Sequence, residues 1–119
     1  MTIHRRTLLA ATAAAPLAAP LVARSQPAGA PIRIGFSIAQ TGTLAAGGRP
    51  SLLARQMWAQ DVNARGGLLG RPVELVFYDD QTSAAQSPGI YAKLLDVDRV
   101  DLIYGPYGTP VQAPILPLA

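Results

Sequence analysis

The stretch VNARGGLLGRPVELVFYDDQ, residues 62–81, contains the change of pattern that decides the fold. It begins where a segment of helical periodicity ends, and the RGG sequence at Arg65–Gly67 supplies a stop signal for that helix. The following residues alternate, which predicts a strand whose one face carries Val73, Leu75 and Phe77. A helix that leads directly into an apolar strand is typical of alternating α/β proteins.

The residues before this stretch predict a first strand and the helix itself. PIRIGF at residues 31–36 alternates and then meets a polar, glycine-rich segment, as expected for a strand followed by a loop. In the segment 50–64, Leu53 and Met57 recur at helical spacing, and its first residue is a proline, which suits the first position of a helix. Met57 and Trp58 are predicted to be packing residues of this helix.

The residues after this stretch repeat the same order. SPGIYAKLLDVD at residues 87–98 predicts a second helix, with Ser87 as its N-cap and a proline at its first position. The apolar side of this helix is formed by Ile90, Leu94 and Val97. VDLIYG at residues 100–105 predicts a third strand, and Thr109 followed by proline repeats the start of a helix.

The alternation predicts a doubly wound α/β fold with a parallel sheet. In the common strand order 2-1-3, the first and third strands are neighbours whose helices leave toward opposite faces, and ligands bind beyond their carboxyl ends. Two loops meet there, residues 37–48 after the first strand and residues 105–109 after the third. We therefore expect a small-molecule site between these loops.

The side chains of these loops favour binding of a small solute. Thr41, Thr43 and Thr109 supply hydroxyls, Tyr107 supplies an aromatic face, and a helix that begins at Pro110 would direct its positive dipole end toward a carboxylate. Thr109 has an alternative role as a helix N-cap that contacts no ligand.

The aspartate pair at the end of the second strand has a less specific meaning. Asp79 and Asp80 are predicted to cap the next turn or to pair with nearby positive groups rather than to bind a ligand.

Composition excludes several other function classes. The chain has no cysteine, and its single histidine, His4, lies in the N-terminal segment, so the remainder cannot form a Ser-His-Asp or Cys-His site and has no metal-ligand spacing. TGTLAAGG at residues 41–48 lacks the spacing of a dinucleotide-binding loop, and we predict neither a cofactor nor a metal. The net charge of +3 comes from Arg5, Arg6 and Arg24, since residues 31–119 carry seven basic and seven acidic side chains, which gives no indication of nucleic-acid binding.

The first 26 residues resemble a cleavable export signal. Arg5 and Arg6 precede an apolar segment at residues 8–22, which at 15 residues is too short to span a membrane. The adjacent arginines favour a twin-arginine signal, with an ordinary basic n-region as the alternative. Cleavage is expected between Arg24 and Pro27, which predicts a soluble, periplasmic protein.

Three segments together resemble one protein family. IRIGFSIAQTGTLAAGGRP, DVNARGGLLGRPVELVFYDDQTSAAQ and KLLDVDRVDLIYGPYGT are similar, in order and spacing, to the opening of the periplasmic solute-binding proteins of ABC importers that include the Leu/Ile/Val-binding protein. The resemblance implies a periplasmic binding protein-like type I fold and places residues 27–119 in the first part of the N-terminal lobe. Family members have two such lobes and are about four times as long.

The resemblance also implies roles for individual residues. Thr109 falls where the family has a hydroxyl that holds the ligand's carboxylate, and Gly108 and Tyr107 lie in the same binding loop. Gly47 falls where the Leu/Ile/Val-binding protein has an aromatic contact, which is a departure from the family pattern. Two prolines, Pro114 and Pro117, are expected to interrupt the third helix almost as it starts.

The resemblance implies an exported protein that delivers amino acids, or similar small carboxylate or amide solutes, to the membrane permease of an ABC-type importer. The alternatives are a ligand-sensing domain of a signalling receptor, an enzyme with a Rossmann-like domain, and a truncated remnant without activity. The missing glycine fingerprint and the lack of histidine and cysteine after residue 26 argue against an enzyme.

Overall fold

The computed structural model describes residues 28–118, so the predicted export signal lies outside the described part of the chain. Strands and helices alternate along these residues as the sequence predicts. Their bounds are β1 (Ile32–Ile38), α1 (Ala45–Ala64), β2 (Val73–Asp79), α2 (Ser87–Asp96), β3 (Leu102–Tyr104), α3 (Thr109–Gln112) and the 3-10 helix η1 (Ala113–Leu118).

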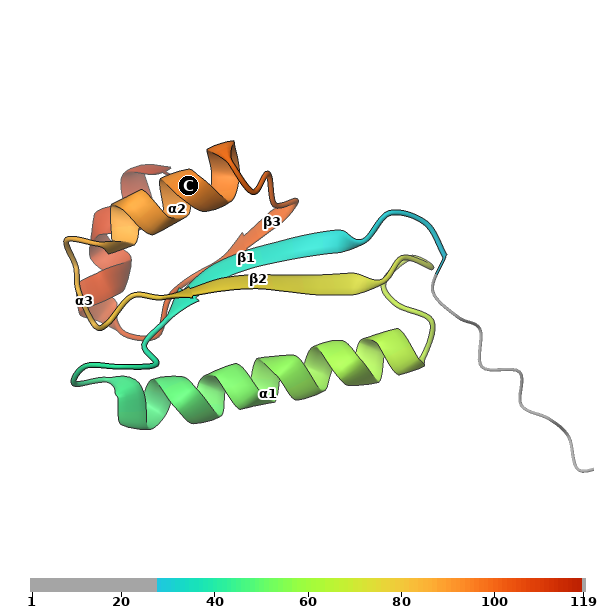
Figure 1. The fold of residues 1–119 in the computed structure, drawn as a ribbon, viewed down its shortest axis with the longest axis horizontal. Coiled ribbons are helices and arrows are strands. Elements are labelled where there is room, and N and C mark those ends of the chain that lie inside the picture. The colour runs from blue at the N-terminus through green and yellow to red at the C-terminus, as the bar shows by residue number, and fades with distance from the viewer. Residues whose placement is uncertain (1–27, 119) are drawn as a thin grey trace, which may run out of the picture.

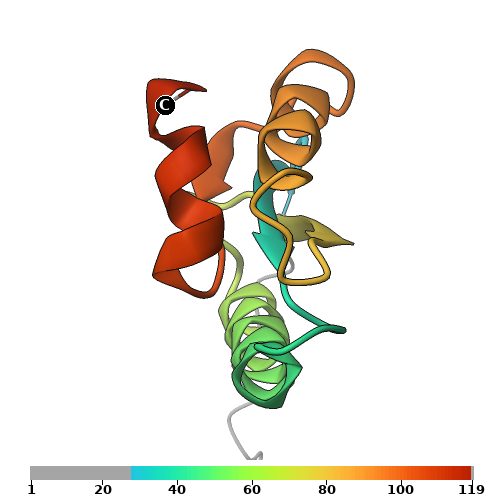
Figure 2. The same cartoon turned by 90° about the vertical axis from the view of Figure 1, so that its left-hand side faces the viewer.

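The three strands form a parallel sheet in the order β2-β1-β3. Ile34 of the central strand is paired with Leu75 on one side and with Leu102 on the other. Helix α1 lies on one face of the sheet, and α2 and α3 lie on the other (Figures 1 and 2). The predicted doubly wound fold and its strand order are therefore confirmed.

The core on the α1 side is formed by alternate residues of β1 and β2. Phe36 and Ile38 are buried against Leu52 of α1, and the ring of Phe36 stacks on that of Phe77 with centroids 5.6 Å apart. Further along the helix, Ala59, Val62 and Val73 form a second buried cluster. These contacts confirm the predicted inward face of the second strand.

The core on the other face is formed around α2. Tyr91 and Leu94 of α2 are buried with Ile115 of η1, and Ile103 of β3 packs against them. Gly35 of β1 makes this close approach possible, because a Cβ there would lie 2.9 Å from a methyl group of Val100.

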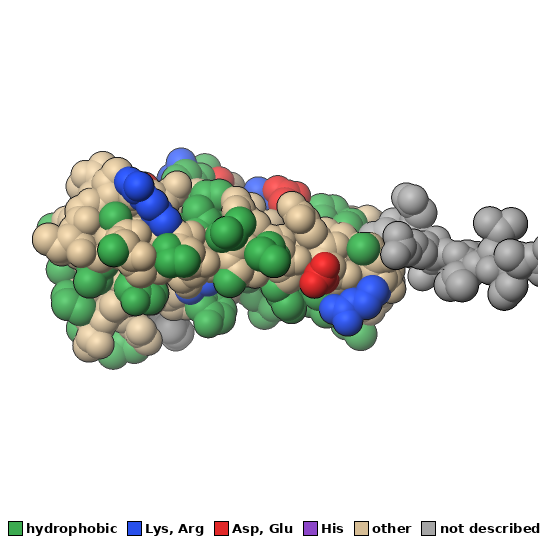
Figure 3. Space-filling model, turned by 90° about the horizontal axis from the view of Figure 1, so that it is seen from below, with side chains coloured by type: hydrophobic (Ala, Val, Ile, Leu, Met, Phe, Trp, Pro, Cys, Tyr) green, Lys and Arg blue, Asp and Glu red, His purple; other side chains and the backbone are tan. Residues whose placement is uncertain are grey.

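The start and the buried side of α1 differ from the sequence prediction. The helix begins at Ala45, so Pro50 lies inside it rather than at its first position. The predicted packing residues of this helix are exposed, at 56% for Met57 and 42% for Trp58. Leu53, which recurs with Met57 at helical spacing, is 57% exposed. Apolar side chains are accordingly spread over the α1 surface seen in Figure 3.

The sheet selects a different side of α1 because the helix comes very close to the end of β1. Gly48 is buried there, and a Cβ at this position would lie 1.9 Å from the carbonyl oxygen of Ala39. The inward side therefore continues from Gly48 to Leu52, Ala59 and Val62. The sequence of α1 has two apolar sides. The side that contains Gly48 packs on the sheet, because only glycine allows so close a backbone approach.

The predicted caps of the later helices are also wrong. Ser87 is the first residue of α2 after Gln86, and its hydroxyl is buried with no hydrogen-bond partner. On the same helix Val97 is 70% exposed, whereas Tyr91 is buried. Thr109 is likewise the first residue of α3 and makes no capping hydrogen bond.

The end of the described chain follows the expectation from its prolines. Helix α3 contains four residues and continues as the 3-10 helix η1, which includes Pro117. Within residues 28–118, no helix combines the length and apolar character needed to cross a membrane.

Two glycine-to-alanine substitutions in helices should have opposite effects on stability. Gly48→Ala is expected to lower the free energy of unfolding by about 2–3 kcal/mol, because the new methyl group collides with backbone. The methyl group added by Gly89→Ala in α2 meets nothing within 4 Å, so this substitution should raise the free energy of unfolding by about 0.5–1 kcal/mol. Urea unfolding followed by circular dichroism measures both, and equal effects would contradict the close approach at Gly48.

Candidate functional site

The loops that follow β1 and β3 meet at the carboxyl edge of the sheet. The ring of Tyr107 lies against Gly47, where an added Cβ would be 2.2 Å from the phenol oxygen. Gly108 has a φ of +109°, and a Cβ there would lie 2.5 Å from a methyl group of Leu44. The structure thus brings together the two loops that the strand order predicts at the ligand-binding edge.

The contact at Gly47 is relevant to the departure from the family pattern. The resemblance expects an aromatic contact at this position, and here the ring of Tyr107 occupies the adjoining space. An aromatic side chain at position 47 and Tyr107 in its present place would exclude each other. In this chain the aromatic side chain beside position 47 is that of Tyr107, in the loop after β3.

A polar hollow of about 360 Å³ lies between α1 and the loop after β3. Ser51 and Arg55 line it from α1, Tyr107 and Gly108 line it from the loop, and Gln112 lines it from α3. Its size is that of a small-molecule site, and phenol, amide and guanidinium groups can all donate hydrogen bonds to a solute.

The predicted site residues divide into two groups. Tyr107 and Gly108 line the polar hollow, whereas Thr41 and Thr109 do not. The side chain of Thr109 is exposed at the end of the same loop, and its hydroxyl is not used for capping. Thr41 is turned toward β2, where its hydroxyl donates a 2.7 Å hydrogen bond to Asp79.

Asp79 fixes the loop after β1 to the end of β2. One carboxylate oxygen accepts hydrogen bonds from the backbone N–H groups of Gln40 and Gln81, each at 2.9 Å, and from that of Thr41 at 3.3 Å. Partial burial raises the pKa of Asp79, but the hydrogen bonds from the Thr41 hydroxyl and the backbone outweigh it, so the pKa is lowered.

Asp80 has a structural role of the same kind. It is fully buried and accepts a 2.8 Å hydrogen bond from the hydroxyl of Ser37 and a 2.9 Å bond from the backbone N–H of Thr82. The turn-capping role predicted for both aspartates is therefore confirmed.

Tyr91 holds the end of β3 beside β1. Its hydroxyl donates a 2.6 Å hydrogen bond to the carbonyl of Tyr104 and accepts a 3.3 Å bond from the backbone N–H of Ser37. Burial raises the pKa of this phenol, so it stays protonated and able to donate at neutral pH. A buried neutral group thus positions the start of the loop after β3.

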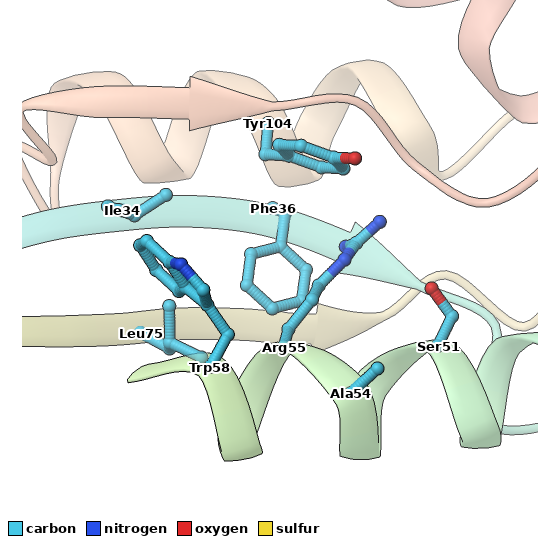
Figure 4. A pocket seen from close by; sticks show the side chains of 8 residues that line it. All are labelled: Ile34, Phe36, Ser51, Ala54, Arg55, Trp58, Leu75 and Tyr104. Carbon is cyan, nitrogen blue, oxygen red and sulfur yellow. The ribbon is translucent and has the colours of Figure 1, made fainter. Parts of the chain in front are cut away.

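Arg55 is a candidate site residue that the sequence interpretation missed. Its guanidinium carbon lies 4.4 Å from the ring centroid of Phe36 and 4.2 Å from that of Tyr104 (Figure 4). The sequence did contain a signal, because Arg55 falls on the inward side between Leu52 and Ala59. The sequence interpretation placed the buried side of α1 on the opposite residues, so Arg55 was not identified.

An apolar hollow of about 500 Å³ adjoins the polar one on the α1 side of the sheet. Its lining includes Ile34, Phe36, Arg55, Trp58, Leu75 and Tyr104 (Figure 4). Arg55, Ser51 and Tyr104 line both hollows. No group of histidine, aspartate or glutamate side chains suited to a metal ion occurs within residues 28–118.

Comparisons with known proteins agree with this geometry. Residues 31–119 match the family model described as periplasmic binding protein. The branched-chain amino acid transporter substrate-binding protein LivJ from Streptococcus pneumoniae, solved with isoleucine, is similar with a TM-score of 0.70 and 28% identity over 73% of this chain and 25% of that chain. No curated protein matches the sequence.

Two further solved structures are similar over the same part of the chain. The periplasmic binding protein type 1 from Bordetella pertussis has a TM-score of 0.69 and 26% identity over 74% of this chain and 24% of that chain. A fatty acid ABC transporter substrate-binding protein from Thermomonospora curvata has a TM-score of 0.67 and 27% identity over 77% of this chain and 23% of that chain. The present chain thus spans about a quarter of the length of these structures.

The hydrogen bonds of Asp79 predict a specific loss of stability in acid. The pKa of Asp79 is lower in the folded than in the unfolded state. Its contribution to the free energy of unfolding is therefore complete above the unfolded pKa of about 3.9, and it is lost as the pH falls through the folded pKa. Asp79→Asn should therefore be less stable than the wild type at pH 7, and the difference should shrink below about pH 4. Urea midpoints from pH 7 to 3 test this, with Asp61→Asn on the exposed side of α1 as the control. A difference that is constant with pH would contradict the assignment.

Proposed function

The chain belongs to the periplasmic binding protein family, and we propose that it forms part of the first lobe of a solute-binding protein for an ABC-type importer. Membership of this family agrees with the expectation of a binding protein rather than an enzyme. The observation that carries the proposal is the contact between the loops after β1 and β3, with the polar hollow beside it at the carboxyl edge of the sheet.

The proposed solutes are amino acids and similar small carboxylates or amides. The similar structure from Streptococcus pneumoniae holds isoleucine, and the one from Thermomonospora curvata belongs to a fatty acid transporter. Both kinds of molecule carry a carboxylate. In this chain the unused hydroxyl of Thr109 and the groups around Tyr107 and Gly108 are the proposed partners for it.

The proposed partner is the membrane permease of the importer, and the proposed location is the periplasm. Residues 1–26, with Arg5 and Arg6, would direct export and then be removed. Delivery to a permease requires two lobes that close around the solute, so that the permease can distinguish the loaded form from the empty one. Residues 28–118 would form one side of that enclosure.

A single wall should bind solute weakly. We expect the 119-residue chain to bind isoleucine with a dissociation constant above about 1 mM, because an open surface leaves most of the ligand in water. Isothermal titration calorimetry measures this value. A dissociation constant below about 10 μM would show that one lobe is sufficient and would contradict the proposed closure.

Thr109 should affect binding without affecting folding. Thr109→Val is expected to weaken isoleucine binding about three- to tenfold by removing one hydrogen bond, and Thr109→Ser should retain it. Chemical shift changes in a ¹⁵N-labelled chain at millimolar isoleucine report the affinities. Because the hydroxyl caps nothing, the free energy of unfolding should change by less than about 0.5 kcal/mol. A loss of about 1 kcal/mol with unchanged binding would instead identify Thr109 as a cap.

A further inference from the structure

Arg55 is held in one position by two aromatic rings. It projects from the inward side of α1, and its guanidinium lies between Phe36 of β1 and Tyr104 of β3, within 4.4 Å of each ring centroid (Figure 4). Stacking of this kind favours a planar guanidinium over the flexible ammonium group of lysine. The cation is therefore ordered before any ligand arrives.

The hydrogen-bonding capacity of this guanidinium is not satisfied. Its Nη1 nitrogen is shielded from solvent and has no hydrogen-bond partner. The ion pair found among residues 28–118 joins Arg33 to Glu74 and does not involve Arg55. Burial lowers the pKa of Arg55, as expected for a desolvated cation without a carboxylate beside it. Arg55 is half-buried, and no carboxylate within residues 28–118 pairs with it, so its guanidinium is available to an anion that enters the hollow.

The guanidinium lies where the polar and apolar hollows meet. On the polar side it shares a lining with Tyr107, Gly108 and Gln112 of the candidate site. On the apolar side it shares one with Ile34 and Trp58. This surrounding fits a molecule that has an anionic end and an apolar body.

We propose that Arg55 holds the anionic group of the solute, so that the site prefers small carboxylates with an apolar body over their neutral amides. The inference rests on the proposed solute-binding role and narrows the class of solute from carboxylates and amides to carboxylates. Guanidinium groups bind carboxylates through paired N–H donors, and such charge-assisted bonds are about twice as strong as neutral ones.

The test compares two probes of equal shape and different charge. Sodium 3-methylbutanoate and 3-methylbutanamide are titrated, up to about 100 mM because weak binding is expected, into the ¹⁵N-labelled 119-residue chain at constant ionic strength. The amide resonances of Gly105 and Gly108 report on the polar hollow, and the emission of Trp58, the single tryptophan, reports on the apolar one. Arg55→Met, Arg55→Lys and, as a matched control at the far end of α1, Arg65→Met are compared with the wild type.

The wild type and Arg65→Met should bind the carboxylate about tenfold or more tightly than the amide. Arg55→Met should lose this preference, and Arg55→Lys should keep part of it because its charge remains. Thermal midpoints establish that each variant is folded, and the ratio of the two affinities within one variant does not depend on its stability.

Three results would overturn the inference. A carboxylate preference that persists in folded Arg55→Met would assign the anion to another group and leave the solute-binding role intact. No response of the wild type to the carboxylate would remove Arg55 as an anion site, while the solute-binding role would still be decided by a protein with both lobes. If Arg55→Met does not fold, Arg55→Lys provides the test. A ratio of carboxylate to amide affinity in Arg55→Lys that equals the wild-type ratio would count against a specific role of the guanidinium.

Discussion

The central position of β1 is the constraint on which the other features depend. Because β1 pairs in parallel with both β2 and β3, each connection must cross one face of the sheet, and the two crossovers lie on opposite faces. The loop after β1 therefore leaves toward α1, while the loop after β3 leads to α3 on the other side. The two loops meet at the carboxyl edge of the sheet, with the polar hollow beside their contact. Asp79 and Tyr91 fix the loops in place through hydrogen bonds to backbone groups.

The sequence predicted the elements and their order because hydrophobic periodicity and glycine or proline signals are local. It also predicted the meeting of the two loops, since this follows from strand order alone. It did not predict the inward side of α1, because Leu53 and Met57 recur at helical spacing as Leu52 and Ala59 do. That choice depends on the distance between Gly48 and Ala39, which is a tertiary quantity.

The errors at the helix starts have a related cause. A Ser or Thr before a proline is a good N-cap signal, yet at Ser87 and at Thr109 the preceding residue takes the cap position. In both cases the helix starts one residue earlier than the pattern indicates, which places the hydroxyl on the first turn. For Thr109 this shift matters to the proposed solute-binding role, because a hydroxyl that is not used for capping is free to contact a solute.

The structure offers a different candidate for anion binding from the helix dipole. Besides the hydroxyl of Thr109, the sequence interpretation named the dipole of a helix beginning at Pro110. Helix α3 has four residues, and such a short helix develops only a small part of a macrodipole. Even a full helix end stabilises an anion by about 0.3–1 kcal/mol at an exposed site, whereas a hydrogen bond to a charged group is worth about 1.5–3 kcal/mol. A desolvated guanidinium that is already ordered between Phe36 and Tyr104 loses little further freedom when a carboxylate binds. If a carboxylate binds at this edge of the sheet, Arg55 therefore contributes more to holding it than α3 does.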